Sequence, residues 1–202
     1  GNNTYGGGVN NSGSLIISGG NIVGNTASSY GGGVCVSGGN LTMNGGKIIG
    51  NFAEIYGGGV YVSANNRMIM DGGAVSYNTA KTSGGGVFIP RDDSVTINLT
   101  INNGSISNNR VTNGRGGGVF AGTNADVIMA GGEIFGNYYQ NLYTADISKV
   151  RWNGGYIEGY GHDHPVCGAS CTHDGNHESV NWHPISSFEE LRNIQSAGYY
   201  YL

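Results

Sequence analysis

Histidine and cysteine gather in one short segment, residues 162–177, near the C-terminal end of the chain. The segment reads HDHPVCGASCTHDGNH and holds four of the five histidines and two of the three cysteines. Thiolate and imidazole ligands at such short spacing suit zinc in a closed tetrahedral site. The predicted ligands of this structural zinc are both cysteines and two of the four histidines, from the set Cys167, Cys171, His162, His164, His173 and His177.

Other interpretations of this segment stay open. A disulfide between Cys167 and Cys171 suits an extracellular setting, but so small a loop adds little chain-entropy stabilisation and leaves the histidines unexplained. The side chains could also be unbound surface residues. A catalytic zinc would need a nearby base, for which Glu178 is the neighbour in sequence. Cys35, the remaining cysteine, is predicted to be an unpaired thiol on the outer face of a strand.

A repeat built on three glycines and a valine positions the rest of the chain. Its copies end at Val9, Val34, Val60, Val87 and Val119, at intervals of 25, 26, 27 and 32 residues. Periods of this length are typical of solenoid proteins. Forty glycines stand beside only three prolines. Because the glycines recur at fixed places between β-branched runs, the composition indicates neither collagen nor disorder.

Each repeat carries three apolar stretches, separated by polar or glycine-rich breaks. Alternation within these stretches points one set of side chains to a common interior. In the second repeat these are Val34, Val36, Leu41, Met43 and Ile48. We therefore expect an all-β fold, a right-handed parallel β-helix with three short strands and about 26 residues per coil. The right-handed sense follows the rule for parallel crossover connections.

An asparagine recurs once in each repeat, just after the third apolar stretch. Stacked one coil apart, these side chains are predicted to form a ladder of amide hydrogen bonds inside a turn. Because buried polar groups require partners, we expect a structural role rather than ligand binding. The ladder comprises Asn25, Asn51, Asn78, Asn109 and Asn137.

A partly aromatic column occupies the outward position between the two valines of the first stretch. Its members are Asn10, Cys35, Tyr61, Phe88 and Phe120. Aromatic pairs across neighbouring strands can stiffen the sheet. Alternatively, Tyr61, Phe88 and Phe120 form a face on which sugar rings bind, since exposed apolar stripes mark interaction sites.

The net charge and the positions of the acidic residues argue against nucleic-acid binding and against catalysis. The net charge is −4 and the nine basic residues are scattered, so we expect no binding to nucleic acid. No run of eighteen apolar residues is present, so no membrane span is expected in this fragment. A β-helix hydrolase or lyase needs clustered carboxylates, but those of the repeats fall at different places in the period, at Glu54, Asp71, Asp126 and Glu133. We therefore predict no enzymatic activity.

Three regions follow from these patterns. Residues 1–160 form the β-helix, with an insertion near Pro90 and a last coil whose aromatic side chains we expect to plug the open end of the core. Residues 161–183 form the His/Cys-rich linker, a candidate zinc knuckle. Residues 184–202 read as a short helix, capped by Ser187 and Glu190 and stopped at Gly198, followed by the start of another module. Since the chain begins inside a repeat, we expect it to be a piece of a longer protein.

Glycine triplets and Gly-Asn turns, as at Gly24-Asn25 and Gly50-Asn51, resemble the repeats of bacterial surface β-helix proteins. These include the polymorphic outer-membrane adhesins and the long surface proteins of gut Firmicutes. The resemblance covers about three quarters of the chain and implies an extracellular location at the bacterial cell surface. The Trp, capped helix and Tyr-Tyr-Leu at the C-terminal end resemble the junction that opens another β-helix module in such proteins.

The leading hypothesis is a non-enzymatic segment of a bacterial cell-surface protein. It would serve as a rigid stalk or an adhesin-like β-helix that binds a host or environmental glycan or a surface protein, joined to further modules of the same chain. The same fold also houses pectate lyases and polygalacturonases, so a polysaccharide lyase or glycoside hydrolase fragment is the enzymatic alternative. A pure spacer that binds nothing is the third hypothesis.

Overall fold

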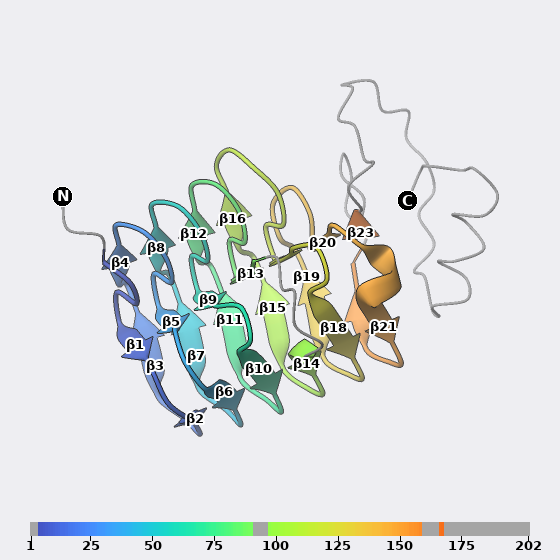
Figure 1. Cartoon of the computed structure of the whole chain (residues 1–202), viewed down its shortest axis with the longest axis horizontal. Helices are drawn as coiled ribbons and strands as arrows, with labels where there is room; N and C mark the ends of the chain where they lie inside the picture. The colour runs from blue at the N-terminus through green and yellow to red at the C-terminus, as the bar shows by residue number, and fades with distance from the viewer. Residues whose placement is uncertain (1–3, 91–96, 159–165, 168–202) are drawn as a thin grey trace.

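The architecture is a parallel β-helix solenoid with about 27 residues per turn. The computed structural model describes residues 4–90, 97–158 and 166–167 of the 202-residue chain. Successive coils lie side by side along the axis of the solenoid, so that each strand is followed by its counterpart one coil on (Figure 1). The parallel β-helix predicted from the sequence is confirmed.

Four parallel sheets run along the solenoid. The first contains β1 (Val9–Asn11), β5 (Val34–Val36), β9 (Val60–Val62), β13 (Val87–Ile89), β17 (Val119–Ala121), β20 (Leu142–Thr144) and β23 (Val166–Cys167). The second contains β2 (Leu15–Ile17), β6 (Asn40–Met43), β10 (Arg67–Met70), β14 (Ile97–Ile101), β18 (Asp126–Met129) and β21 (Val150–Trp152). The third contains β3 (Asn21–Val23), β7 (Lys47–Ile49), β11 (Ala74–Ser76), β15 (Ser105–Ser107), β19 (Glu133–Phe135) and β22 (Tyr156–Ile157). The fourth contains β4 (Thr26–Ala27), β8 (Phe52–Ala53), β12 (Thr79–Ala80) and β16 (Arg110–Val111).

The fourth sheet is a correction to the predicted three strands per coil. Its strands have two residues each, too short for the alternation of apolar and polar residues that identifies a strand in a sequence. One residue of each pair faces the interior, as Ala53 does, and it is fully buried. Hydrogen bonds to the neighbouring coils define these strands, and no local pattern could indicate them.

The core is a single column of apolar side chains enclosed by the four sheets. All five predicted inward residues of the second coil, Val34, Val36, Leu41, Met43 and Ile48, are 0% exposed. Most of their equivalents in the other coils belong to the same cluster; in the first coil Val9, Leu15 and Ile22 are partly buried against it, and the polar Asn11 stands at the position of Val36. The parallel register places each one on its counterpart, as Leu41 lies on Met68. The predicted orientation of these strands is therefore confirmed.

The glycine triplets allow the coils to approach one another closely. Gly57 has a left-handed backbone, with φ of +67°. A Cβ added to Gly58 would lie 2.4 Å from the carbonyl carbon of Thr79 and 2.5 Å from the carbonyl oxygen of Gly85, too close for any side chain. Gly19, in contrast, has no heavy atom within 4 Å of such a Cβ.

The last described coil departs from the others. The 3₁₀ helix η1 (Ile147–Lys149) precedes β21, and Trp152 packs into the core with 8% of its surface exposed. The prediction that the aromatic residues of this region plug the core is wrong for Tyr138, Tyr139 and Tyr156, which are 55%, 36% and 42% exposed. They occupy outward or turn positions, from which their side chains cannot pack into the core.

Several predictions concern residues outside the described ranges. These are the insertion at residues 91–94, the capped helix and next module at 184–202, and most of the linker at 161–183. Within the linker, the backbone of β23 pairs with β20, so the first sheet includes residues 166–167. Among the described residues, no helix has the length and apolar character needed to span a bilayer.

Candidate functional site

The five predicted asparagines form a continuous hydrogen-bonded ladder inside the turn between the third and fourth sheets. Asn51 donates from both its backbone N and its Nδ2 to Asn78 Oδ1, each at 2.9 Å. Asn78 makes the same pair of bonds to Asn109 Oδ1, and Asn109 to Asn137 Oδ1. Asn25 begins the series by donating to Asn51 Oδ1.

The second Nδ2 proton of each interior asparagine is bound as well. Asn78 Nδ2 donates at 2.9 Å to the carbonyl oxygen of Ile48, one coil earlier. Each amide therefore donates twice and accepts twice, which uses every hydrogen-bonding site of both amide atoms. Asn78 and Asn109 are 0% exposed, so the ladder fills a dry interior column and offers no free group to a ligand.

Asn141, which the sequence analysis missed, ends the ladder. The backbone N and Nδ2 of Asn137 donate to Asn141 Oδ1 at 3.1 and 2.8 Å, and Asn141 Nδ2 donates to the carbonyl oxygen of Glu158. Asn141 lies directly before β20, where the third glycine of the triplet stands in the other coils, so its side chain reaches the ladder from a different place in the repeat. A search for a single period therefore could not find it.

The predicted aromatic column is part of a larger stack. Phe88 lies 4.8 Å from Phe120 and 5.6 Å from Tyr61 between ring centroids, with interplanar angles of 7° and 8°. Tyr143 continues the stack beyond Phe120 at 4.9 Å. A second column, formed by the tyrosines just before the glycine triplets, interleaves with the first: Tyr30 stacks on Tyr61 at 4.7 Å and Tyr56 on Phe88 at 4.3 Å.

Stacking of this kind occupies the faces of the rings. Phe88 is only 6% exposed, and both of its neighbours in the column lie parallel to it. Burial, followed by the nearby Tyr30 hydroxyl, raises the pKa of Tyr61 from 10.0 to about 12. At the far end, Arg115 lies over the ring of Tyr143 and donates to its hydroxyl at 2.8 Å. The geometry is that of packing, since a sugar ring needs a free aromatic face.

Cys35 lies beside Tyr61 in the register of the first sheet. It is a free thiol, as expected, but it is 1% exposed although it occupies an outward position. Burial raises the pKa of the Cys35 thiol from 9.0 to about 11. Because thiol chemistry requires the thiolate, this side chain is an inert packing residue.

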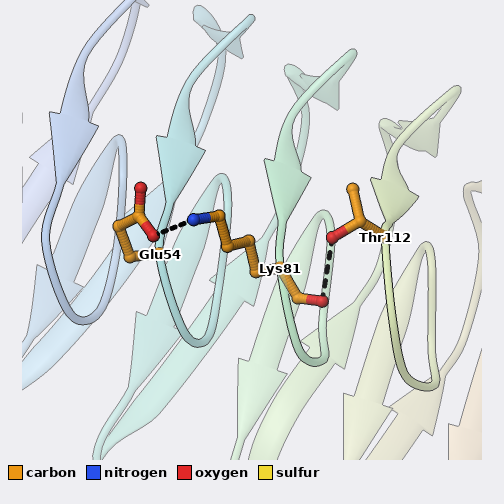
Figure 2. A network of polar contacts seen from close by, with 3 residues as sticks. All are labelled: Glu54, Lys81 and Thr112. Atoms are coloured by element: carbon orange, nitrogen blue, oxygen red, sulfur yellow. Dashed lines mark hydrogen bonds and ion pairs between the residues drawn. The ribbon is translucent and has the colours of Figure 1, made fainter.

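Three of the four carboxylates predicted to be scattered, Glu54, Asp71 and Asp126, each have a different partner. Glu54 and Lys81, which directly follow strands β8 and β12 of the fourth sheet, form an ion pair. Thr112 donates to the carbonyl oxygen of Lys81 at 3.1 Å, so that three successive coils are linked on one outer face (Figure 2). Asp71 accepts a hydrogen bond from Asn102 Nδ2 at 2.7 Å. Asp126 pairs with Arg151 at 2.9 Å.

No cluster of three or more histidine, cysteine, aspartate or glutamate side chains occurs in the described ranges. The predicted zinc ligands fall outside them, apart from the backbone of Cys167 in β23. The zinc site therefore stays a prediction from the sequence.

Two groups of exposed aromatic side chains were missed by the sequence analysis. Tyr138 packs edge to face against Tyr139 with centroids 4.7 Å apart, and the guanidinium of Arg110 lies 5.0 Å from the Tyr138 ring. Tyr77, directly after β11, is 62% exposed. A left-handed backbone, with φ of +55°, distinguishes Tyr77 from the tyrosines of the stack. The sequence signal was available, because Tyr77 stands where three other repeats have glycine, at Gly24, Gly50 and Gly136.

No protein-family model matches the chain. Neither the curated proteins nor the solved structures include a match. The function is therefore argued from the residues of this chain.

Proposed function

We propose that this chain is a rigid, non-enzymatic segment of a bacterial cell-surface protein, in the manner of a stalk or an adhesin-like β-helix. One observation carries the proposal: the asparagine ladder continues without a break from Asn25 to Asn141. The ladder bonds run from coil to coil, as do the backbone bonds of all four sheets. Bending or opening the solenoid would lengthen many of these bonds together.

The outer surface supports the same proposal. The stack from Tyr30 to Tyr143 joins consecutive coils through ring contacts. Glu54, Lys81 and Thr112 join three coils beside the fourth sheet. Glu54, Asp71 and Asp126 each pair with a cation or an amide, an arrangement that stabilises a surface and leaves no two of these three acids together to act as acid and base.

Limited proteolysis with trypsin tests the rigidity. Lys47, Lys81 and Arg110 are exposed on successive coils, but cleavage requires local unfolding of the strand around each of them. We expect these bonds to survive in the native chain and to be cut in an Asn78→Ala variant, in which the ladder is interrupted. Rapid cleavage of the native coils would overturn the rigid-stalk proposal.

Incubation with plant, host and microbial polysaccharides tests the absence of catalysis. We expect neither new reducing ends nor unsaturated products. Either product, lost on substitution of a single carboxylate, would replace this proposal with the enzymatic alternative.

The His/Cys segment belongs to the same proposal as a zinc-stapled linker between modules. Its support is the spacing of Cys167 and Cys171 among four histidines. Native mass spectrometry without reductant tests it: a bound zinc that chelator removes would support the linker. A metal-free chain two hydrogens lighter would instead establish a disulfide.

A further inference from the structure

Tyr77 occupies a backbone position that the fold otherwise gives to small residues. The residue after each of the first five third-sheet strands has a left-handed conformation, with φ of +67° at Gly24, +65° at Gly50 and +60° at Gly136. Tyr77 and Asn108 fill the same position in the two middle coils, both with φ of +55°. A bulky side chain is unfavourable there. Folding alone would favour glycine.

Two serine hydroxyls lie next to these side chains. Side chains alternate between the two faces of a strand. Val75 and Ile106 are fully buried in the core, so the next residues, Ser76 and Ser107, point outward. Each serine is only 6% exposed. Within the described part of the chain neither Oγ takes part in a hydrogen bond. Ser29 Oγ is the one fully buried side-chain oxygen without a partner in that part, so the Oγ atoms of Ser76 and Ser107 reach the surface. The hydroxyls are thus available to a molecule bound on this face.

The surrounding side chains define a short strip across the third sheet. Ser76 and Ser107 are paired in register and lie between the larger Ile49 and Phe135. At about 4.8 Å per coil, Ile49 and Phe135 are separated by about 14 Å. The strands that carry the strip, β11 and β15, lie in the middle of the solenoid (Figure 1).

Tyr77 and Asn108 border the strip on one side. Tyr77 is 62% exposed, and within the described residues no other aromatic ring stacks on it. Asn108 extends over the next coil, where its Oδ1 would lie 2.9 Å from a Cβ added to Gly136. The glycine thus leaves room for the amide to lie flat on the surface.

We propose that Tyr77, Ser76, Ser107 and Asn108 form a binding site for a neutral oligosaccharide. This inference rests on the proposed adhesin-like function and assigns its binding surface. An exposed aromatic ring receives the apolar face of a sugar, while hydroxyl and amide groups exchange hydrogen bonds with sugar hydroxyls. The residues of the site carry no charge, and Lys47 and Glu133 at the two ends of the strip have opposite signs, so neither an anionic nor a cationic ligand is favoured.

Because the backbone of Tyr77 is left-handed, a substitution at this position can remove the side chain without lowering the stability of the fold. A Tyr77→Gly variant places the residue that the fold prefers in a left-handed position, so the variant should unfold at the same temperature as the native chain or higher. A loss of binding in this variant could not then be attributed to misfolding. Tyr138→Ala serves as the matched control, since it removes a similarly exposed tyrosine that pairs with Arg110 of the fourth sheet instead of lying beside the third.

Isothermal titration calorimetry of the whole chain tests the site. The probes are tetrasaccharides of β-linked glucose, xylose, mannose, galactose and N-acetylglucosamine. We expect at least one to bind, and Tyr77→Gly to raise its Kd tenfold or more. Tyr77→Phe should keep most of the affinity, and the double substitution of Ser76 and Ser107 by alanine should weaken it several-fold. The Tyr138→Ala control should leave the Kd unchanged.

Two outcomes would overturn this site. One is the absence of binding by every tetrasaccharide at millimolar concentration, and the other is binding that Tyr77→Gly leaves unchanged. A chain that binds none of the probes but resists trypsin would still be a rigid stalk, so failure of this site is distinct from failure of the proposed function. Capture of a protein partner through Tyr77 with no oligosaccharide bound would also overturn the carbohydrate assignment.

Discussion

Removal of the Asn78 side chain should destabilise the solenoid far more than an ordinary surface substitution. Asn78→Ala deletes the two bonds accepted at Oδ1 from Asn51 and the two donated by Nδ2. Two buried donors would then have no partner, the Asn51 backbone N–H and one Nδ2 proton of Asn51, and the carbonyl oxygen of Ile48 in strand β7 would lose one accepted bond. At roughly 1–3 kcal/mol for each unsatisfied group, the expected loss is about 5 kcal/mol.

Asn25→Ala is the matched control, because Asn25 lies at the first rung of the ladder. Its side chain makes one bond in the ladder, from Nδ2 to Asn51 Oδ1 at 2.9 Å, and its backbone bond to the same oxygen survives the substitution. The expected loss is about 1 kcal/mol. The contrast between Asn78→Ala and Asn25→Ala isolates the ladder from any general effect of removing an amide.

Thermal unfolding followed by circular dichroism measures both variants. For a chain of this size, about 2–4 °C of melting temperature corresponds to 1 kcal/mol, so Asn78→Ala should melt about 10–20 °C below the native chain. Urea titration should give the same order, with a similar m-value showing that the folded state is equally compact. Equal losses for the two variants, or a loss below about 1 kcal/mol for Asn78→Ala, would refute the view that the ladder is dry and fully bonded.

Three further predictions follow from the packing. Gly58→Ala should lower the free energy of unfolding by at least about 3 kcal/mol because its Cβ has no room, whereas Gly19→Ala should change it by less than about 0.5 kcal/mol; paired urea titrations measure both. Cys35 should resist alkylation at pH 8 in the native chain and react only in unfolding concentrations of urea, as peptide mapping would show; rapid labelling of the native chain would contradict its burial. Cys35 and Tyr61 should add no pH dependence to stability below their ordinary pKa values of 9.0 and 10.0. Stability should fall as pH rises toward their folded pKa values of about 11 and 12, because the unfolded chain releases these protons first. A flat melting temperature from pH 8 to 11.5 would count against both shifts.

The period of the solenoid and the identity of its core could be predicted from the sequence. The valines after the glycine triplets fix where each coil begins, and alternation around them decides which side chains face inward. Leu41 and Met43 are fully buried for this reason. The column of asparagines is equally visible, because one residue type recurs at one place in the period. Local rules suffice wherever the neighbour of a residue is its own counterpart one coil away.

Other features depend on how different parts of a coil meet. The stack pairs Tyr30 with Tyr61 and Tyr56 with Phe88, contacts between two different columns whose proximity depends on the turn at the glycine triplets. The fourth sheet likewise exists because Phe52 and Ala53 find partners in adjacent coils.

The sequence by itself determined the period, the inward side chains and the ladder position, because these follow from the repeat and from alternation along a strand. Only the tertiary structure decided which exposed side chains are available. Phe88, predicted as a ligand-binding residue, lies between other rings, whereas the exposed Tyr77 lies beside the unpartnered hydroxyl of Ser76. The physical reason is that exposure depends on neighbours from other coils, which the stacking of the solenoid brings together.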